Sequence, residues 1–249
     1  MIDHYRDLVE ADRLTRSMHG RLEYLRTQEI LRRTLPSRAT ILDVGGATGV
    51  HAKWLSDDGH HVHLVDPVPE HVEAAREQGI SAAIGDARRL GERDDSYDVV
   101  LLFGPLYHLT GAADRRRAVA EARRVLRPGG QLFAAGISRY LTLLEFGTNG
   151  RLGPDNESDV DTVIRIGAYN RHAAFTDAHF HTGDELAAEL AGFTDVEVFG
   201  VEGPAWPTLD ATGNPGHIDA ALRAARLVEQ DPALIHASAH LIARATRGR

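Results

Sequence analysis

Three aspartates follow short apolar runs and could together bind an organic ligand. Asp43 is the second-last residue of the run ATILDV, Asp66 ends HHVHLVD, and Asp86 follows ISAAIG. If these runs are neighbouring parallel strands, their carboxyl ends meet at one edge of the sheet, where open sheets bind ligands. There Asp66 could accept hydrogen bonds from both hydroxyls of a ribose, and Asp86 from an exocyclic amine. One acid for the sugar and one for the base predict an adenosine site.

The glycines after Asp43 predict a tight turn at the same edge. Gly45, Gly46 and Gly49 would let the backbone approach a ligand and turn into a helix, whose N-terminus offers free N–H groups. The turn GGATG lacks the G-x-G-x-x-G spacing that cradles a pyrophosphate, and no Gly-Lys-Ser/Thr follows it. It therefore favours an adenosine compound without phosphates. An ordinary turn and helix caps are the alternative, but that alternative treats the three acids as unrelated.

A mainly parallel sheet is needed to position these residues. Apolar runs predict strands at 39–44, 60–66, 80–87, 97–104 and 131–137, and helices at 49–59, 69–79 and 114–130 lie between or after them. Nearly continuous apolar strands that alternate with helices indicate a parallel sheet covered on both faces. Towards the C-terminus, 183–203 predicts a helix and a strand, 216–232 a helix, and 234–247 a final strand.

Two segments depart from this alternation. Residues 1–35 are predicted to be helical up to Pro36 and to form a cap or lid over the pocket of a core at 36–249, within one domain overall. Residues 138–181 are predicted to be an inserted substrate-side segment that contains a long loop, because GTNGRLGPDNESD is rich in Gly, Asn and Asp. Phe146, Tyr169 and Phe175 there could stack an aromatic substrate or simply pack.

The motifs ILDVGGATG, VDP, GDA, YDVVLLFGPLYHL and VLRPGG resemble, in order and spacing, those of class I S-adenosylmethionine-dependent methyltransferases. The resemblance is close over residues 39–137 and loose elsewhere. It implies a Rossmann-like α/β fold with a seven-stranded, mainly parallel sheet and a reversed final hairpin. It also implies S-adenosyl-L-methionine as the cofactor. The family's central glycine is replaced here by Ala47, which is small enough to preserve the close approach.

The resemblance carries roles onto matching positions. Asp43 and the three glycines would line the methionine part, Asp66 would hold the ribose and Asp86 the adenine amine. Phe103 and Gly104 would lie beneath the methionine part. The remaining cofactor-binding residues expected from the motifs are Pro67, Gly85 and Ala87.

Methyl transfer from a sulfonium depends mainly on positioning the acceptor, with help from a base where the acceptor carries a proton. His108, in GPLYHL after the fourth strand, is the candidate base, because its pKa lies near working pH; packing over the cofactor is the alternative. Tyr5 and Glu10 are further catalytic candidates in the N-terminal segment. Arg21 or Tyr5 could hold the carboxylate of the methionine moiety, and for each a solvated helix face is the alternative.

The composition limits which partners and metal sites are expected. The chain has 249 residues, a net charge of −8 and no cysteine. We therefore expect a cytoplasmic protein without thiolate metal sites, nucleic-acid partner or membrane partner; a homodimer is compatible with the sequence. The run Arg115–Arg117 is expected to be a solvated helix face. His61 with His63, and His179 with His181, share strand faces, but no carboxylate cluster accompanies them, so no metal is expected.

The leading hypothesis is a methyltransferase that acts on a small acceptor, of aromatic or indole type, in bacterial secondary metabolism. A NAD-dependent oxidoreductase could use the same sheet and the acid after the second strand, but it needs the missing pyrophosphate turn. A non-catalytic adenosylmethionine-binding protein would keep the three aspartates and transfer nothing. N-, O- and C-methylation are not distinguished by the sequence.

Overall fold

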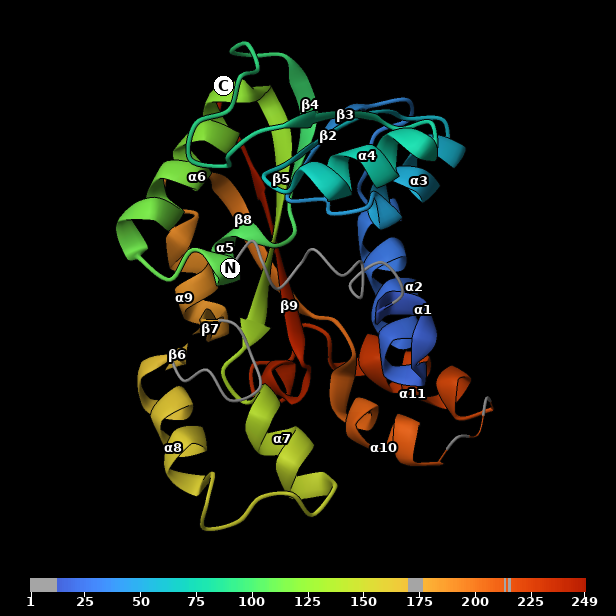
Figure 1. Ribbon diagram of the computed structural model, residues 1–249, viewed down its shortest axis with the longest axis vertical. Helices are drawn as coiled ribbons and strands as arrows, with labels where there is room; N and C mark the ends of the chain where they lie inside the picture. Colours follow the sequence, from blue (N-terminus) through green and yellow to red (C-terminus); the bar gives the residue numbers. More distant parts are fainter. Residues whose placement is uncertain (1–12, 170–176, 213, 215) are drawn as a thin grey trace.

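A twisted sheet runs through the centre of the molecule, with helices on both of its faces (Figure 1). The structure is a computed structural model and describes residues 13–169, 177–212, 214 and 216–249. Within these residues, no helix is long and apolar enough to cross a membrane.

Seven strands form the expected sheet in the order β3-β2-β1-β4-β5-β9-β8. Their bounds are β1 (Thr40–Val44), β2 (His61–Asp66), β3 (Ser81–Ile84), β4 (Tyr97–Leu102), β5 (Leu126–Ser138), β8 (Thr194–Gly200) and β9 (His240–Thr246). The strands β1 to β5 pair in parallel, and β9 runs antiparallel to both β5 and β8. The mainly parallel sheet with a reversed final hairpin is therefore confirmed.

Two short strands beyond the seven expected ones extend this sheet. The strand β7 (Ala178–His181) pairs in parallel with the last residues of β5, and β6 (Ala168–Tyr169) pairs antiparallel with β7. The 13-residue β5 pairs with β4 only up to Ala134. It therefore leaves room for β7 beyond that point.

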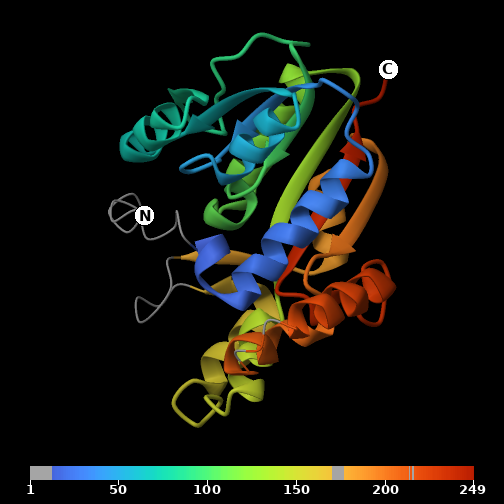
Figure 2. The same cartoon turned by 90° about the vertical axis from the view of Figure 1, so that its right-hand side faces the viewer.

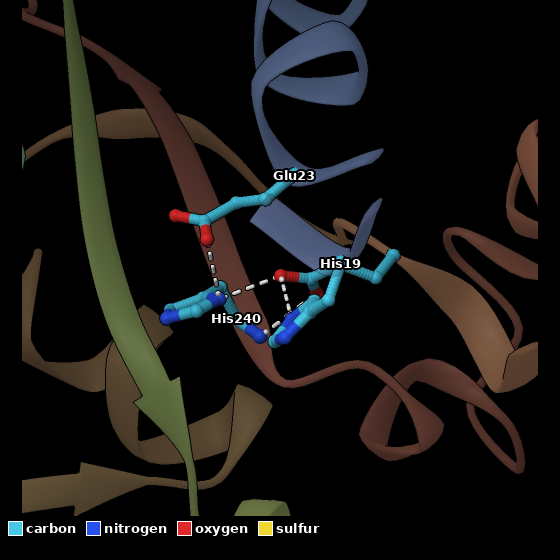
Figure 3. Close-up of side chains that lie close together, drawn as sticks. His19, Glu23 and His240 are labelled. Carbon is cyan, nitrogen blue, oxygen red and sulfur yellow. Dashed lines mark hydrogen bonds and ion pairs between the residues drawn. The ribbon is translucent and has the colours of Figure 1, made fainter. Parts of the chain in front are cut away.

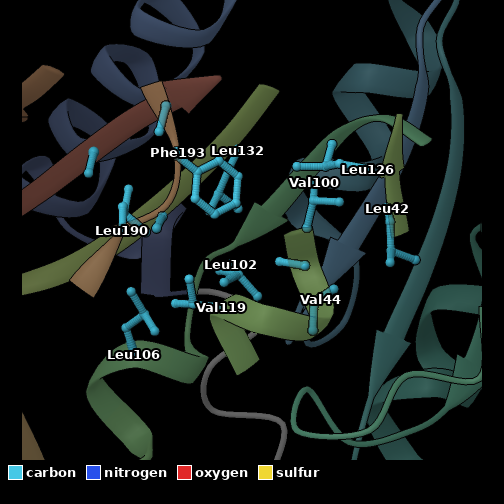
Figure 4. Close-up of a cluster of buried hydrophobic side chains, with 14 of the residues drawn as sticks. Leu42, Val44, Val100, Leu102, Leu106, Val119, Leu126, Leu132, Leu190 and Phe193 are labelled. Carbon is cyan, nitrogen blue, oxygen red and sulfur yellow. The ribbon is translucent and has the colours of Figure 1, made fainter. Parts of the chain in front are cut away.

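Each strand of the sheet centre packs on both of its faces, because successive side chains point to opposite sides. Val100 and Leu102 of β4 join a cluster with Val119 of α6 (Ala112–Val125) and with Leu190, next to α9 (Gly183–Glu189), as Figure 4 shows. On the other face, Leu101 joins a separate cluster. This alternation explains why the strands are apolar throughout their length.

The second cluster includes the N-terminal helix. Ile30 and Leu31 of α2 (Met18–Arg32) pack with Trp54 of α3 (Val50–Asp57) and with the sheet. In Figure 2, α2 lies alongside the sheet. Helix α2 thus belongs to the core, whereas the sequence predicted only a cap in this region. The short helix α1 (Arg13–Arg16) precedes it, and α4 (Pro69–Glu77) covers β2 and β3.

Residues 138–181 contain helices where the sequence predicted a long loop. They form α7 (Leu141–Thr148) and α8 (Glu157–Ile166), so only residues 149–156 of the Gly- and Asn-rich segment are irregular. The amphipathic α8 buries Val160 and Val163, which makes it stable as a helix. The remaining helices are α5 (Pro105–His108), α10 (Trp206–Thr212) and α11 (His217–Val228).

Two further predictions are corrected by the structure. Helix α6 ends at Val125, and residues 126–130 belong to β5, because Pro128 disfavours helical geometry at the residue before it. The run Arg115–Arg117 is not a uniform solvated face. Arg115 is buried, pairs with Glu189 at 2.6 Å and donates to the backbone carbonyls of Leu109 and Thr110.

Candidate functional site

A cavity of about 400 Å³ opens at the carboxyl ends of β1, β2 and β4. This volume is within the range of small-molecule sites. Ten of the residues predicted from the sequence line it: Gly45, Gly46, Asp66, Pro67, Gly85, Asp86, Ala87, Phe103, Gly104 and His108. The sheet thus brings together motifs that are separated by up to 63 positions in the sequence.

The glycine turn adopts left-handed backbone angles that glycine takes more easily than other residues. Gly45 has φ of 75° and Gly49, the N-cap of α3, has φ of 89°. A Cβ atom on Gly46 would lie 2.5 Å from Oδ2 of Asp43, so no larger side chain fits there. Ala47, which replaces the family's central glycine, also takes a left-handed φ of 48°. The turn therefore holds an alanine in a conformation that costs an L-residue about 1–2 kcal/mol.

Asp43 lies beneath this turn and does not line the cavity, which differs from the predicted common cleft of three acids. It is fully buried, and neither carboxylate oxygen has a hydrogen-bond partner among the described residues. Burial, with a smaller contribution from the negative charge of Asp66, raises the pKa of Asp43 to about 7. Successive side chains of β1 point to opposite faces of the sheet. The Asp43 side chain is on the face opposite to the one that packs on α6.

Asp66 lines the cavity but already accepts several hydrogen bonds. Its Oδ2 accepts from the Ala47 N–H at 3.0 Å, and its Oδ1 accepts from the Val68 N–H at 2.9 Å. The Nδ1 atom of His71 lies 3.2 Å from the same Oδ1. Since a carboxylate offers about four acceptor positions, Asp66 has room for a further donor. Asp66 therefore stabilises the glycine turn and also presents a hydrogen-bond acceptor to the cavity.

Asp86 also lines the cavity, and Arg88 holds it. The Arg88 guanidinium approaches Oδ2 of Asp86 at 2.5 Å, and the Arg88 N–H donates to Oδ1 at 2.8 Å. Hydrogen bonds from the Arg88 side chain are the main reason that the pKa of Asp86 is lowered. The carboxylate is therefore ionised at neutral pH, but it shares its oxygens with Arg88 as well as with any ligand.

Strand β4 leads into another wall of the cavity, formed by residues 103–109. Gly104 has φ of 143° and directs the chain into the four-residue helix α5, at whose end His108 lies half-buried. The rings of His108 and Tyr107 are 4.6 Å apart. Tyr107 also packs on the apolar cluster around Phe180, and both rings line the cavity.

Several predicted residues are not brought to the cavity or lie outside the described part of the chain. Arg21 is exposed on α2 and does not line the cavity, so the structure does not place it where a ligand carboxylate would need a donor. Phe146 lies under the guanidinium of Arg151, outside the cavity lining. Tyr5, Glu10, Phe175 and the side chain of Tyr169 lie outside the described part of the chain.

Several polar residues of the cavity lining were not identified from the sequence, among them Glu23, His51, His71 and His240. His51 and His71 lie in the first turns of α3 and α4, next to the two motifs that were identified, and could have been found from that position. Glu23 and His240 come from α2 and from the start of β9. For His240 the only indication in the sequence was the predicted reversed hairpin. An antiparallel last strand begins at the edge where the parallel strands end, which is where ligands bind.

His240, which is labelled in Figure 3, forms an ion pair with the buried Glu202. The Nδ1 atom of His240 lies 2.6 Å from Oε1 of Glu202, and the His240 backbone N–H donates to Oε2 at 3.0 Å. Burial by itself would raise the pKa of Glu202, but the charges and hydrogen bonds of His240 and His19 outweigh it and hold this pKa far below its usual range. Glu202 is therefore an ionised carboxylate with no solvent exposure.

A second group of possible metal ligands lies away from the cavity, where β7, the strand that contains HFH, approaches α9. His179, His181 and Glu189 place donor atoms within 4.8 Å of one another, so the fold supplies the carboxylate that the sequence seemed to lack. Arg115 already pairs with Glu189 at 2.6 Å, and its positive charge opposes a metal ion there. Burial lowers the pKa of His179 to about 4 and that of His181 to about 3, so both rings are neutral at pH 7.

The residues of the cavity fit an adenosyl sulfonium compound. The glycine turn offers close backbone approach, and the carboxylate of Asp43 under it has no partner among the described residues. Asp66 and Asp86 present acceptors on the cavity wall. No lysine lines the cavity, and Arg88, the one lining arginine among the described residues, is paired with Asp86 and Asp114, so no cation is set aside for a diphosphate.

Comparison with known proteins supports the same family. Residues 42–134 match a family model described as a methyltransferase domain. The ubiquinone biosynthesis O-methyltransferase of Xylella fastidiosa (strain M23) is 30% identical over 168 residues, which cover 61% of this chain and 67% of that protein. The ubiquinone/menaquinone biosynthesis C-methyltransferase UbiE of Acidiphilium cryptum is 39% identical over 111 residues. That match covers 40% of this chain and 43% of the relative, so the chain spans less than half of that relative's length.

A solved S-adenosylmethionine-dependent methyltransferase from Thermotoga maritima has the same fold. It superposes with a TM-score of 0.64 at 21% identity, and the match covers 99% of this chain and 98% of that one. The motifs, the strand order and the relatives agree with one another. The cofactor of this group is S-adenosylmethionine. The chain belongs to the class I S-adenosylmethionine-dependent methyltransferase family.

Proposed function

We propose that this chain transfers the methyl group of S-adenosylmethionine to a small, flat and largely apolar acceptor of aromatic or indole type. One observation carries the proposal. A single cavity of about 400 Å³ joins the glycine turn to a wall that contains Phe103, Tyr107 and Ile242. Rings and branched aliphatic side chains favour a flat apolar molecule. The volume leaves little room for a large acceptor beside the cofactor.

The cofactor end of the cavity is assigned from its acceptors. Asp66 would hold the ribose hydroxyls, Asp86 the adenine amine, and Gly45 and Gly104 would pass close to the methionine part. When bound, the cofactor supplies a methyl group activated by a sulfonium sulfur. The chain would hold the acceptor in line with this methyl group, and a base of the chain would take the acceptor's proton. The chain's own contribution is the alignment of the two reactants, which can supply up to about 7–11 kcal/mol.

His108 is the candidate base on the acceptor side. It lines the cavity at the end of α5, beside the ring of Tyr107. A general base contributes roughly 10²–10⁴-fold where the acceptor carries a proton. An amine or phenol acceptor would therefore depend on His108 more than an acceptor that has no proton to lose.

The acceptor class is supported by what surrounds the cavity. The lining is mainly apolar, and the net charge of −8 provides little attraction for a nucleic acid. Two relatives are named for ubiquinone biosynthesis, which favours a small metabolite. We place the acceptor in secondary metabolism because the helical N-terminal segment and the GPLYHL motif resemble those of bacterial enzymes that tailor such compounds. The family match does not support the oxidoreductase alternative. Only an activity assay distinguishes an enzyme from a non-catalytic protein that binds S-adenosylmethionine.

The proposal is tested by incubating the protein with methyl-labelled S-adenosylmethionine and a panel of indoles, phenols and amines. We expect label to appear in at least one aromatic product. His108→Ala should lower turnover at least tenfold while cofactor affinity changes less than twofold. His217→Ala, on the exposed face of α11, is the matched control and should leave both unchanged. Binding of adenosylhomocysteine without transfer to any acceptor would contradict the proposal and favour the non-catalytic alternative.

A further inference from the structure

Four side chains beside the cavity form a cluster of metal-ligand type. His19 and Glu23 come from α2, Glu202 follows β8, and His240 begins β9. Each residue places one nitrogen or oxygen donor within 4.8 Å of the donors of all the others. Figure 3 shows His19 and Glu23 facing His240 from the helix. The set contains two imidazoles and two carboxylates.

Two local features bring these donors together. His19 and Glu23 are four residues apart on α2, so their side chains share one face of the helix. The antiparallel pairing of β8 and β9 places Gly200 opposite Leu241, and the Val201 N–H donates to the His240 carbonyl at 3.0 Å. Glu202 and His240 are therefore neighbours across the end of the hairpin. A helix face and a hairpin end that are far apart in sequence converge on one point.

The distances between donor atoms are close to those around a single ion. His19 Nε2 lies 3.7 Å from Glu202 Oε1, and His240 Nδ1 lies 3.6 Å from Glu23 Oε2. Ligand distances of 2.0–2.2 Å in a tetrahedron place neighbouring donors roughly 3.3–3.6 Å apart. The 2.6 Å contact from His240 Nδ1 to Glu202 Oε1 is a hydrogen bond and would lengthen when an ion replaces its proton. Of these three distances, it is the one that must open appreciably.

We propose that His19, Glu23, Glu202 and His240 bind one divalent transition-metal ion, with Zn²⁺ as the ion that best fits four nitrogen and oxygen ligands. Two imidazoles favour a transition metal over Mg²⁺ or Ca²⁺, which prefer oxygen ligands throughout. The charge is also suitable, because two carboxylates in a nearly dry environment match a 2+ ion. The His240 backbone N–H on Oε2 of Glu202 fixes the orientation of this ligand.

An ion at this point would join α2 to the β8–β9 hairpin. Four protein ligands complete a tetrahedral shell, as in structural zinc sites. Glu23 and His240 also line the cavity, so the ion would lie in its wall, on the side that faces α2. Its consequence is therefore a stabilised helix–hairpin contact and a rigid cavity wall. This inference does not depend on the proposed methyl transfer.

The test measures binding of the metal alone, without an acceptor. Protein treated with a chelator and dialysed is titrated with Zn²⁺ by calorimetry and with Co²⁺ by visible absorption. We expect one ion per chain with a dissociation constant in the micromolar range or below, the absorption of tetrahedral Co²⁺, and a higher melting temperature with Zn²⁺. His19→Ala and Glu23→Gln should each weaken binding at least tenfold and remove the rise in melting temperature.

Two control variants identify the site. His51→Gln removes another cavity histidine, and His179→Ala disrupts the second histidine group; both should leave Zn²⁺ affinity unchanged. His19 retains some solvent exposure, and Glu23→Gln preserves the shape of a nearly buried side chain, so both substitutions should leave the fold intact, as circular dichroism would verify. Absence of Zn²⁺ and Co²⁺ binding at 100 µM in the wild type would overturn the proposal. So would affinity retained in both cluster variants, or affinity lost only in His179→Ala.

Discussion

At the residue scale, the site depends on backbone conformations and buried charges that cost free energy. Ala47 takes a left-handed φ of 48° in the glycine turn. Asp43 is a buried carboxyl with no hydrogen-bond partner among the described residues. Strain and unsatisfied groups of this kind occur at binding sites, where the surrounding structure enforces them. The strain at Ala47 and the buried carboxyl of Asp43 each have an effect on stability that can be measured.

Replacing Ala47 by glycine should stabilise the protein. The left-handed conformation costs alanine about 1–2 kcal/mol, and the greater freedom of glycine in the unfolded chain offsets about 0.4–1 kcal/mol of that gain. We expect the free energy of unfolding of Ala47→Gly to rise by roughly 0.5–1 kcal/mol in urea denaturation. Ala74→Gly, inside α4, is the matched control and should lower it by about 1 kcal/mol. Equal losses for both variants would show that the turn is not strained.

Asp43 should make stability fall as pH rises towards neutrality. The folded-state pKa of about 7 lies above the value near 4 expected for an unfolded chain, so the folded state holds the proton more tightly. This contribution is complete below pH 4 and is lost as pH rises through about 7, with a magnitude of up to about 4 kcal/mol. Urea denaturation at several pH values between 4 and 8 should show this decline. Asp43→Asn, which stays neutral, should flatten it; the same slope in both proteins would refute the assignment.

At the element scale, α2 connects the core to the cavity wall. Ile30 and Leu31 pack against the sheet, while Glu23 and Thr27 line the cavity from the same helix. Ser17 is its N-cap and accepts a hydrogen bond from the Gly20 N–H at 2.9 Å. Since His19 lies in the first turn, the cap also holds one residue of the proposed metal cluster in place.

Removing this cap should destabilise α2 locally. We expect Ser17→Ala to lower the free energy of unfolding by about 1 kcal/mol, because one helix N–H loses its partner. Ser17→Asp is the matched control: it retains an acceptor, places a negative charge at the positive end of the helix, and should stay within about 0.5 kcal/mol of the wild type. Denaturation followed by circular dichroism measures both. A loss in Ser17→Asp as large as in Ser17→Ala would argue against capping as the cause.

At the scale of the whole molecule, the cavity links elements from both halves of the chain. Its lining includes α2, the turns after β1 and β2, α5, and the start of β9. A ligand that binds only the folded state stabilises all of them together. Binding should therefore be visible in global unfolding.

Adenosylhomocysteine should raise the melting temperature. At a concentration 100 times its dissociation constant, it would add about 2.7 kcal/mol, or roughly 5–10 °C for a chain of this size. NAD at the same concentration should produce no shift, because no cation is set aside for its diphosphate. Asp66→Ala should weaken adenosylhomocysteine binding more than tenfold through the lost ribose acceptor. Differential scanning calorimetry measures the shift, and a larger shift with NAD would contradict the cofactor assignment.

Much of the fold and part of the site were determined by local sequence patterns. Apolar runs that alternate with amphipathic stretches predict β1–β5, α3, α4 and α6, because side-chain periodicity reflects which faces are buried. The glycine turn and the acids at 66 and 86 lie at predictable strand ends. Asp43 was identified too, but its position beneath the turn was not, since it depends on which face of β1 packs on α3.

The rest was decided only by tertiary structure. Glu23, Glu202 and His240 meet because α2 packs beside the β8–β9 hairpin, and no periodicity along the chain specifies that contact. The pairing of Arg115 with Glu189, over 74 positions, likewise depends on how α6 and α9 pack. Strands β6 and β7 form because β5 continues beyond β4. Local patterns specify which face of an element is buried, whereas contacts between distant elements depend on how those faces pack together.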